Sequence, residues 1–175
     1  MLNGQSYTPS TKLASLTKFD IGLQGVGITH EQKSSTNVTI DISAGGGGGY
    51  DISEGYISYN LKLQKPAFYF LLNPKYYYNQ NSRITRGKNT IFNSGNYLGA
   101  RIKYVSPNDA QLELTRNSIL VNIHWGLQRA ISSKWTINTH VGVGYAQDID
   151  NNFGTPYPAI DFKFSYIFTK NNNER

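Results

Sequence analysis

Two histidines, His124 and His140, are the residues of this chain whose types and spacing could do chemistry. Each stands on the polar side of a segment in which polar and apolar residues alternate, so neighbouring strands would bring the two imidazoles close together. With Asp161 in the following segment they would offer three ligands to a metal ion. With Ser118 or Ser165 they would offer the serine, histidine and acid arrangement of a lipid hydrolase.

Other features of the sequence speak against both kinds of site. The chain has no cysteine, no Gly-x-Ser-x-Gly motif that would expose a nucleophile, and no glutamate in the central part of a predicted strand. We therefore predict no catalytic residue, no metal and no cofactor, and we expect both histidines to fill the interior of the fold as hydrogen-bonded groups. A lipid-modifying enzyme that uses one of these histidines is the second hypothesis.

A run of five glycines, Gly45 to Gly49, is the most visible local feature. A phosphate-binding loop would need a Lys-Ser/Thr pair and a helix after its glycines, but Tyr50, Asp51 and Ile52 follow here. We interpret the run as a strand that bends sharply or lets bulky neighbours approach its backbone. The same interpretation applies to Gly25-Val26-Gly27 and Gly142-Val143-Gly144.

The elements that carry these residues are expected to be the strands of one domain. The chain of 175 residues has 13 Tyr and 17 Gly, and its charged residues make up only 16%, against about 25% in ordinary soluble domains. This composition disfavours disorder and favours β structure. The sequence has no run of about 18 apolar residues, which excludes a transmembrane helix. The first residues do not form an intact signal peptide, so export would depend on a signal that has been removed.

Period-two alternation and turn chemistry predict eight strands between residues 17 and 168. The expected strands span residues 18–30, 36–51, 55–64, 67–79, 95–105, 118–130, 134–146 and 158–168. Residues 1–16 are expected to form a poorly ordered leader, and residues 169–175 a polar tail.

Successive predicted strands share one strongly apolar face and one face rich in Gly, Asn, Lys, Arg, His and Asp. Trp, Phe, Tyr and Ile are too bulky to fill the interior of an eight-stranded barrel, whereas glycines suit a narrow interior. We therefore predict an all-β fold, an eight-stranded antiparallel transmembrane β-barrel with up-and-down order, whose apolar face meets lipid. Aromatic residues near the strand ends would form girdles at the membrane interfaces, namely Phe19, Trp135, Tyr145, Tyr166 and Phe168.

The polar face would then line the interior of the barrel. Because buried charges need partners, we expect a network of ion pairs and hydrogen bonds that plugs the lumen against solutes larger than ions. The surplus of cations in this network would favour anions. Its expected members are Asp20, Asp41, Lys62, Lys75, Arg101, Lys103, His124, His140, Asp161 and Lys163.

A basic cluster of Arg83, Arg86 and Lys88 lies in the connection between the fourth and fifth predicted strands. With both chain ends in the periplasm this connection is periplasmic as well, and Tyr76 and Tyr78 stand beside it. We expect these residues to contact anionic headgroups or a protein partner. The other basic residues are scattered and no nucleic-acid-binding module is recognisable, so nucleic acid is not an expected partner.

The chain resembles a group of small outer-membrane β-barrels common in Bacteroidetes. The resemblance is carried by Lys65-Pro66-Ala67-Phe68, Asn73-Pro74-Lys75-Tyr76-Tyr77-Tyr78-Asn79, Arg83, Gly87-Lys88-Asn89-Thr90 and Ser94-Gly95-Asn96-Tyr97-Leu98. The last strand, which ends in Phe168, is similar to the terminal signal by which such barrels are recognised for assembly, although further residues follow it here. The resemblance implies a multi-pass barrel in the bacterial outer membrane and says little about activity.

The leading hypothesis from the sequence is a non-enzymatic structural or accessory subunit of an envelope protein complex, such as secretion, transport or outer-membrane assembly machinery. Its expected partners are outer-membrane lipid, lipopolysaccharide and one or more proteins of the outer membrane or periplasm. Besides the lipid-modifying enzyme, the sequence leaves open a soluble secreted barrel that binds a small ligand.

Overall fold

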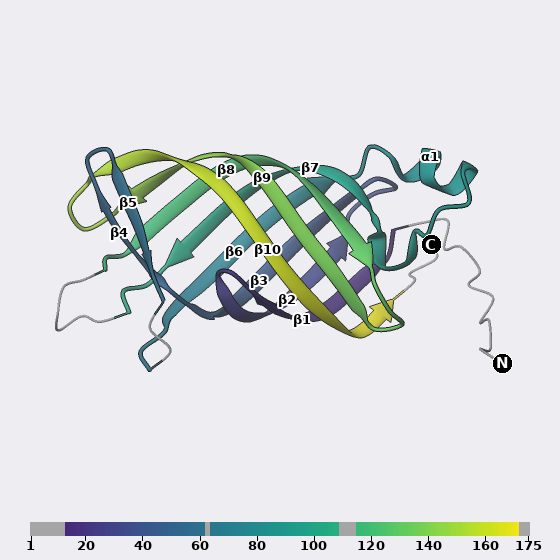
Figure 1. Cartoon of the computed structure of the whole chain (residues 1–175), viewed down its shortest axis with the longest axis horizontal. Coiled ribbons are helices and arrows are strands. Elements are labelled where there is room, and N and C mark those ends of the chain that lie inside the picture. Colours follow the sequence, from purple (N-terminus) through teal and green to yellow (C-terminus); the bar gives the residue numbers. More distant parts are fainter. Residues whose placement is uncertain (1–12, 62–63, 109–114, 172–175) are drawn as a thin grey trace.

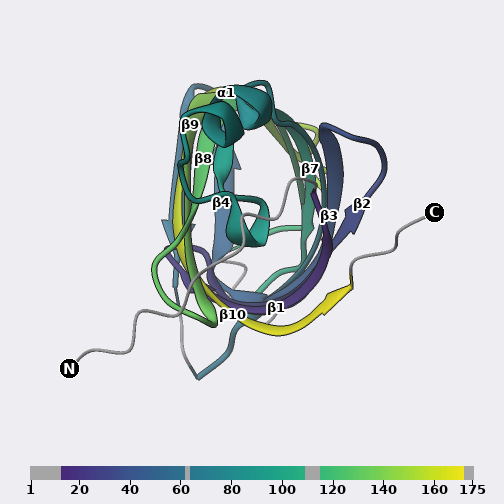
Figure 2. The ribbon, with the colours of Figure 1, turned by 90° about the vertical axis from the view of Figure 1, so that its right-hand side faces the viewer.

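Eight antiparallel strands close into a barrel in the computed structural model, which describes residues 13–61, 64–108 and 115–171. The predicted eight-stranded, up-and-down barrel is thereby confirmed, with β10 pairing with β1 to close it. Figure 1 shows the barrel from the side and Figure 2 from one end. The barrel strands are β1 (Ser15–Gly22), β2 (Gly25–Lys33), β3 (Val38–Gly47), β6 (Ala67–Tyr76), β7 (Gly95–Val105), β8 (Ser118–Ala130), β9 (Trp135–Asp148) and β10 (Gly154–Asn171).

The two ends of the barrel carry different elements. We call the end where β1 begins and β10 ends the terminal end, and the opposite one the far end. At the terminal end, α1 (Gln80–Thr85) and a 3-10 helix (Ile91–Asn93) lie in the connection from β6 to β7 (Figure 1). Among the described residues, no helix is long and apolar enough to cross a membrane.

At the far end, a hairpin of β4 (Gly49–Ser53) and β5 (Tyr56–Asn60) forms a separate two-stranded sheet (Figure 1). Tyr50 and Ile52 of this hairpin are buried in an apolar cluster with residues of the barrel mouth, namely Ala67, Val105, Leu120 and Ala146. Burial raises the pKa of the Tyr50 hydroxyl well above its usual range. The hairpin is therefore packed onto the barrel mouth as a partial cover.

The predicted strand 18–30 is wrong, because the structure has two strands there, β1 and β2, joined by a turn at Leu23 and Gln24. Gly25 has a φ of +112° in this turn, a conformation that residues with a side chain rarely adopt. The outward side chains change parity at the turn, from Ile21 before it to Val26 after it. This change of parity is the signal in the sequence that marks the turn.

The predicted strand 55–64 contains β5, which pairs only with β4 and does not belong to the barrel. The predicted strand 36–51 likewise joins β3 to the start of β4. These differences compensate for the missed turn, so the barrel still has eight strands. At the chain ends, β1 begins inside the predicted leader and β10 extends beyond the predicted strand 158–168. Residues 1–12 and 172–175 lie outside the described residues.

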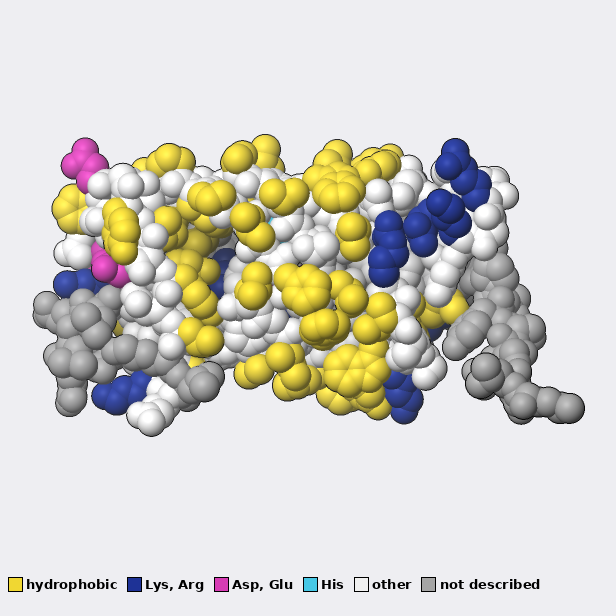
Figure 3. All heavy atoms as spheres, viewed as in Figure 1, with side chains coloured by type: hydrophobic (Ala, Val, Ile, Leu, Met, Phe, Trp, Pro, Cys, Tyr) yellow, Lys and Arg dark blue, Asp and Glu magenta, His cyan; other side chains and the backbone are white. Residues whose placement is uncertain are grey.

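Large apolar side chains cover the outside of the barrel, and polar side chains fill the inside. On β8, for example, Ile123 is 67% exposed, whereas its neighbours Asn122 and His124 are buried. Figure 3 shows apolar side chains distributed over the flank of the barrel. The prediction that the apolar face points outward is confirmed by this arrangement.

Tyrosines inside the barrel lie over glycines of the neighbouring strand. Tyr97 on β7 is directly opposite Gly126 on β8, and a Cβ atom on Gly126 would overlap the Tyr97 ring. The same relationship joins Tyr69 to Gly45 and Tyr157 to Gly144. Such cross-strand pairs let a large ring cover an exposed stretch of backbone, so the glycines give the interior room for its aromatic residues.

Candidate functional site

Glu31 on β2 is the centre of the charged interior. Its carboxylate accepts hydrogen bonds from the ammonium groups of Lys18 at 2.7 Å and Lys75 at 3.0 Å. Lys75 also lies 2.8 Å from the carboxylate of Asp41, and all four side chains are at most 2% exposed. Three neutral side chains donate to Glu31 as well, namely Thr39, Tyr77 and Gln128.

Glu31, which lies outside the predicted strands, is the third residue from the end of β2 and is buried inside the barrel. The predicted first strand, 18–30, runs through the turn at Leu23 and Gln24 and stops one residue before Glu31. Beyond that turn the inward positions continue through Thr29 to Glu31. Lys18 was also absent from the predicted network, although it stands at the first residue of the predicted strand 18–30.

A second group of charges lies farther along the barrel. Lys163 on β10 pairs with Asp20 at 2.7 Å, and Thr29 donates to the same carboxylate at 2.6 Å. Arg101 on β7 pairs with Asp161 on β10 at 2.9 Å. Each carboxylate of this group therefore has a cation from another strand. The Asp20–Lys163 pair joins the neighbouring strands β1 and β10, whereas the Arg101–Asp161 pair joins β7 and β10, which are not neighbours.

His124 and His140 stack against each other inside the barrel, with ring centroids 4.1 Å apart. Nδ1 of His124 lies 2.7 Å from Oδ1 of Asn122, and Nδ1 of His140 lies 3.3 Å from the guanidinium of Arg101. Asp161, the third ligand considered for a metal, is the ion-pair partner of Arg101. Within the described residues, no group of three His, Cys, Asp or Glu is placed to hold a metal ion.

The serines considered for hydrolysis do not join the histidines. Ser118 donates to the backbone carbonyl of Arg116, and Ser165 is opposite Thr136 on the neighbouring strand. Neither serine forms a hydrogen bond with a histidine in the described part of the chain. The arrangement there can fill the lumen and hold charge, but it does not assemble a nucleophile and a base.

Lys103 on β7 differs from the other interior cations. Its ammonium group donates to the side-chain oxygen of Gln24 and lies over the rings of Tyr50 at 5.4 Å and Tyr69 at 4.8 Å. In the described part of the chain no carboxylate lies within ion-pairing distance of it. Among the described residues, Lys103 is therefore the interior cation that exceeds the carboxylates available for pairing. Lys62, the remaining predicted member of the network, lies outside the described residues.

The residues predicted to contact a partner lie at the terminal end. Tyr76 and Tyr78 are about half exposed, whereas Tyr77 between them is buried in the lumen. Arg83 on α1 donates to the carbonyl of Asn89 at 2.7 Å. Arg86 and Lys88 are exposed, and basic side chains gather at this end in Figure 3.

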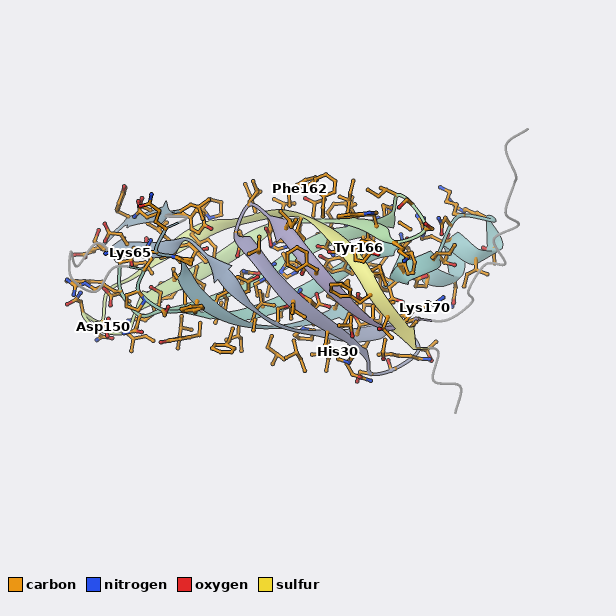
Figure 4. The ribbon with its side chains drawn as sticks, turned by 90° about the horizontal axis from the view of Figure 1, so that it is seen from below. His30, Lys65, Asp150, Phe162, Tyr166 and Lys170 are labelled. Carbon is orange, nitrogen blue, oxygen red and sulfur yellow. The ribbon has the colours of Figure 1, made fainter. Side chains whose placement is uncertain are left out.

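The predicted girdle residues lie on the outer side of the barrel. Near the terminal end, the Tyr166 ring packs against Trp135 at 5.2 Å and Phe168 at 5.5 Å. Phe19 is half-buried opposite Tyr166, and Tyr145 is exposed toward the far end. Figure 4 shows Tyr166 on the flank, with Lys170 toward the terminal end and Asp150 at the far end.

Comparisons with models of protein families, with curated proteins and with solved structures found no match. The fold alone defines the class, a closed eight-stranded antiparallel barrel with an apolar exterior and charged side chains buried in its interior. The resemblance to the outer-membrane barrels of Bacteroidetes stays a prediction.

Proposed function

We propose that this chain is an integral β-barrel of a bacterial outer membrane and acts there as a non-enzymatic structural or accessory subunit of an envelope protein complex. The observation that carries the proposal is the continuous apolar exterior, on which Ile28, Ile123 and Val143 are more than half exposed. In water this surface would be costly to expose, whereas in lipid it is favourable. Closure of the barrel supports the proposal further, because along the stretches where neighbouring strands pair it satisfies backbone groups that lipid cannot hydrogen-bond.

The filled interior favours a structural role over passage of solutes. Lys18, Glu31 and Lys75 have fully buried side chains and lie in the lumen between the strands that they connect. A solute would have to break these ion pairs, and a charge left without its partner in such a site costs about 3–5 kcal/mol.

The terminal end is the surface that we propose for contact with a partner. It presents Arg86 and Lys88 beside the half-exposed rings of Tyr76 and Tyr78. Basic and aromatic side chains together suit both anionic lipid headgroups, including those of lipopolysaccharide, and the rim of a protein interface. In the proposed orientation this end faces the periplasm.

Membrane insertion is tested first, by carbonate extraction of cells that express the chain and by its behaviour without detergent. We expect the protein to stay with the membrane fraction and to require detergent for solubility. A protein that leaves the membrane in carbonate and stays monodisperse in buffer would overturn the proposal and favour the soluble ligand-binding barrel.

The contact surface is tested by a double charge reversal, Arg86→Glu and Lys88→Glu, followed by cross-linking and purification from native membranes in mild detergent. We expect this variant to lose the proteins that accompany the wild type. Lys134→Glu is the matched control, because Lys134 is an exposed basic residue in the β8–β9 turn at the same end. Identical companions in wild type, double variant and control would exclude this surface as the site of contact.

A further inference from the structure

The wall of the barrel has a side opening toward the far end. β1 pairs with β10 only from Lys163 onward, and Leu23 in the β1–β2 turn donates its N–H to the carbonyl of Phe162. Between Gly154 and Ile160, β10 pairs with β9 alone. Figure 1 shows this part of β10 passing above the β1–β2 turn toward the β4–β5 hairpin.

Two prolines suit this free edge of β10. The carbonyl of Phe162 points toward β1, and that of Asp161 points toward β9, where Thr139 donates to it. Because backbone groups alternate between the two sides of a strand, Pro156 and Pro158 fall on the side of the free edge. Proline has no N–H that would need a partner there, so the opening does not leave these two positions with an unsatisfied donor.

A cavity of about 250 Å³ connects this opening with the lumen. Its inner wall includes Arg101, Lys103 and Asn122, and the hairpin covers it with Tyr50 and Tyr59. Its outer rim includes two residues of the apolar exterior, Leu23 and Ile160, which are 58% and 61% exposed. Figure 3 shows a recess on this side of the molecule with basic side-chain atoms at its floor.

We propose that this opening binds a single-chain amphiphile with an anionic headgroup, such as a long-chain carboxylate. The headgroup enters the cavity and pairs with Lys103, the buried cation for which the described residues supply no carboxylate. The chain leaves through the opening and lies along Leu23 and Ile160, in the hydrocarbon around the barrel. The inference rests on the proposed membrane insertion, because that insertion places hydrocarbon outside the opening.

The size of the cavity agrees with a ligand that is only partly enclosed. Sites that enclose whole small molecules measure about 300–1,000 Å³, so 250 Å³ holds a headgroup and the beginning of one chain. The lining of the cavity also agrees with such a ligand, because its polar and cationic groups lie inside and its apolar groups lie at the rim. A free fatty acid and a single-chain phospholipid both combine an anionic headgroup with one acyl chain.

The experiment uses the full chain reconstituted in phosphatidylcholine nanodiscs, with spin-labelled stearate as the probe and the immobilised fraction as the readout. We expect saturable binding, and binding at least about tenfold weaker for the methyl ester of the same probe, because one charge-assisted contact is worth about 1.5–3 kcal/mol. Lys103→Gln is expected to weaken stearate binding by a similar factor. Lys134→Gln, an exposed lysine away from the cavity, is the control and is expected to bind as the wild type does.

Equal binding of stearate and its ester, or no saturable binding, would overturn the proposal even if no variant folds. Equal affinity of wild type and a folded Lys103→Gln protein would overturn it as well. Unlabelled palmitate and a lysophosphatidic acid used as competitors show which headgroup is preferred, and displacement by either supports the proposal. Insertion without binding would refute this inference alone. A barrel that does not insert would refute the proposed function, and binding of stearate in buffer would then show a headgroup site whose ligand chain does not lie in hydrocarbon.

Discussion

The ammonium group of Lys75 lies 3.0 Å from the carboxylate of Glu31, and both side chains are fully buried. Lys75 is on β6 and Glu31 on β2, and β3 stands between these two strands in the barrel. The ion pair therefore connects two strands that share no backbone ladder. Its partners on β1 and β3, Lys18 and Asp41, extend the connection to four strands.

Removal of the central carboxylate is expected to destabilise the barrel strongly. Glu31 is the one described residue that supplies an anion within ion-pairing distance of Lys18. Glu31→Gln would remove it, a loss of about 3–5 kcal/mol for a buried pair that loses one partner. Urea unfolding of the refolded protein in detergent measures this change. Glu54→Gln, at an exposed position in the β4–β5 turn, is the control and should leave the midpoint unchanged. A wild-type midpoint for Glu31→Gln would contradict the role assigned to this network.

The contact between the Tyr97 ring and Gly126 predicts that one added methyl group destabilises the barrel. Gly126→Ala would place a Cβ atom into the ring of Tyr97, and overpacking of this kind costs about 1–3 kcal/mol. Gly46→Ala is the matched control, because the nearest atom to a Cβ atom there is 3.5 Å away. The difference in unfolding free energy between the two variants is the measurement. Equal unfolding free energies of the two variants would show that the Tyr97 ring does not need a glycine at position 126.

The stacked histidines are expected to be dispensable for lipid chemistry. Replacement of both His124 and His140 by Ala should leave the lipid A and phospholipid profiles of the cells unchanged, because neither ring is hydrogen-bonded to a serine in the described part of the chain. Mass spectrometry of extracted lipids provides the comparison with cells that express the wild type. A changed profile in the double variant would revive the hypothesis of a lipid-modifying enzyme.

The loop between β9 and β10 is expected to loosen in acid. Asp150 accepts hydrogen bonds from the backbone and side-chain N–H groups of Asn117, which lower the pKa of its carboxyl. A carboxyl with a lowered pKa in the folded state stabilises the loop above its unfolded pKa of about 3.9. That contribution disappears as the pH falls through the lower folded value.

Hydrogen exchange at the Asn117 amide, followed from pH 6 down to pH 3 and corrected for the intrinsic rate, measures this effect. Protection is expected to fall at the acid end in the wild type. Asp150→Asn has no carboxyl to titrate, so its protection should not change with pH. A pH-independent wild type would show that the carboxylate does not hold the loop.

Regular strands were predictable because they keep one period throughout. The bounds predicted for β7 and β8, 95–105 and 118–130, agree with the structure. The turn between β1 and β2 was missed because only two residues, Leu23 and Gln24, separate the strands. The strand that contains β5 was assigned to the barrel because its polar and apolar residues alternate as they do in the barrel strands. A local pattern does not tell which sheet a strand joins.

The sequence by itself determined which face of each barrel strand is apolar, because side chains of a strand alternate between two faces whatever the strand pairs with. It also indicated where glycine makes room and where charge enters the lumen. Only the tertiary structure decided that Glu31 meets Lys75 and that none of the described carboxylates pairs with Lys103. Those relationships depend on register and closure, which bring together residues far apart in the chain. The side opening is decided in the same way, by how far β10 extends beyond β1.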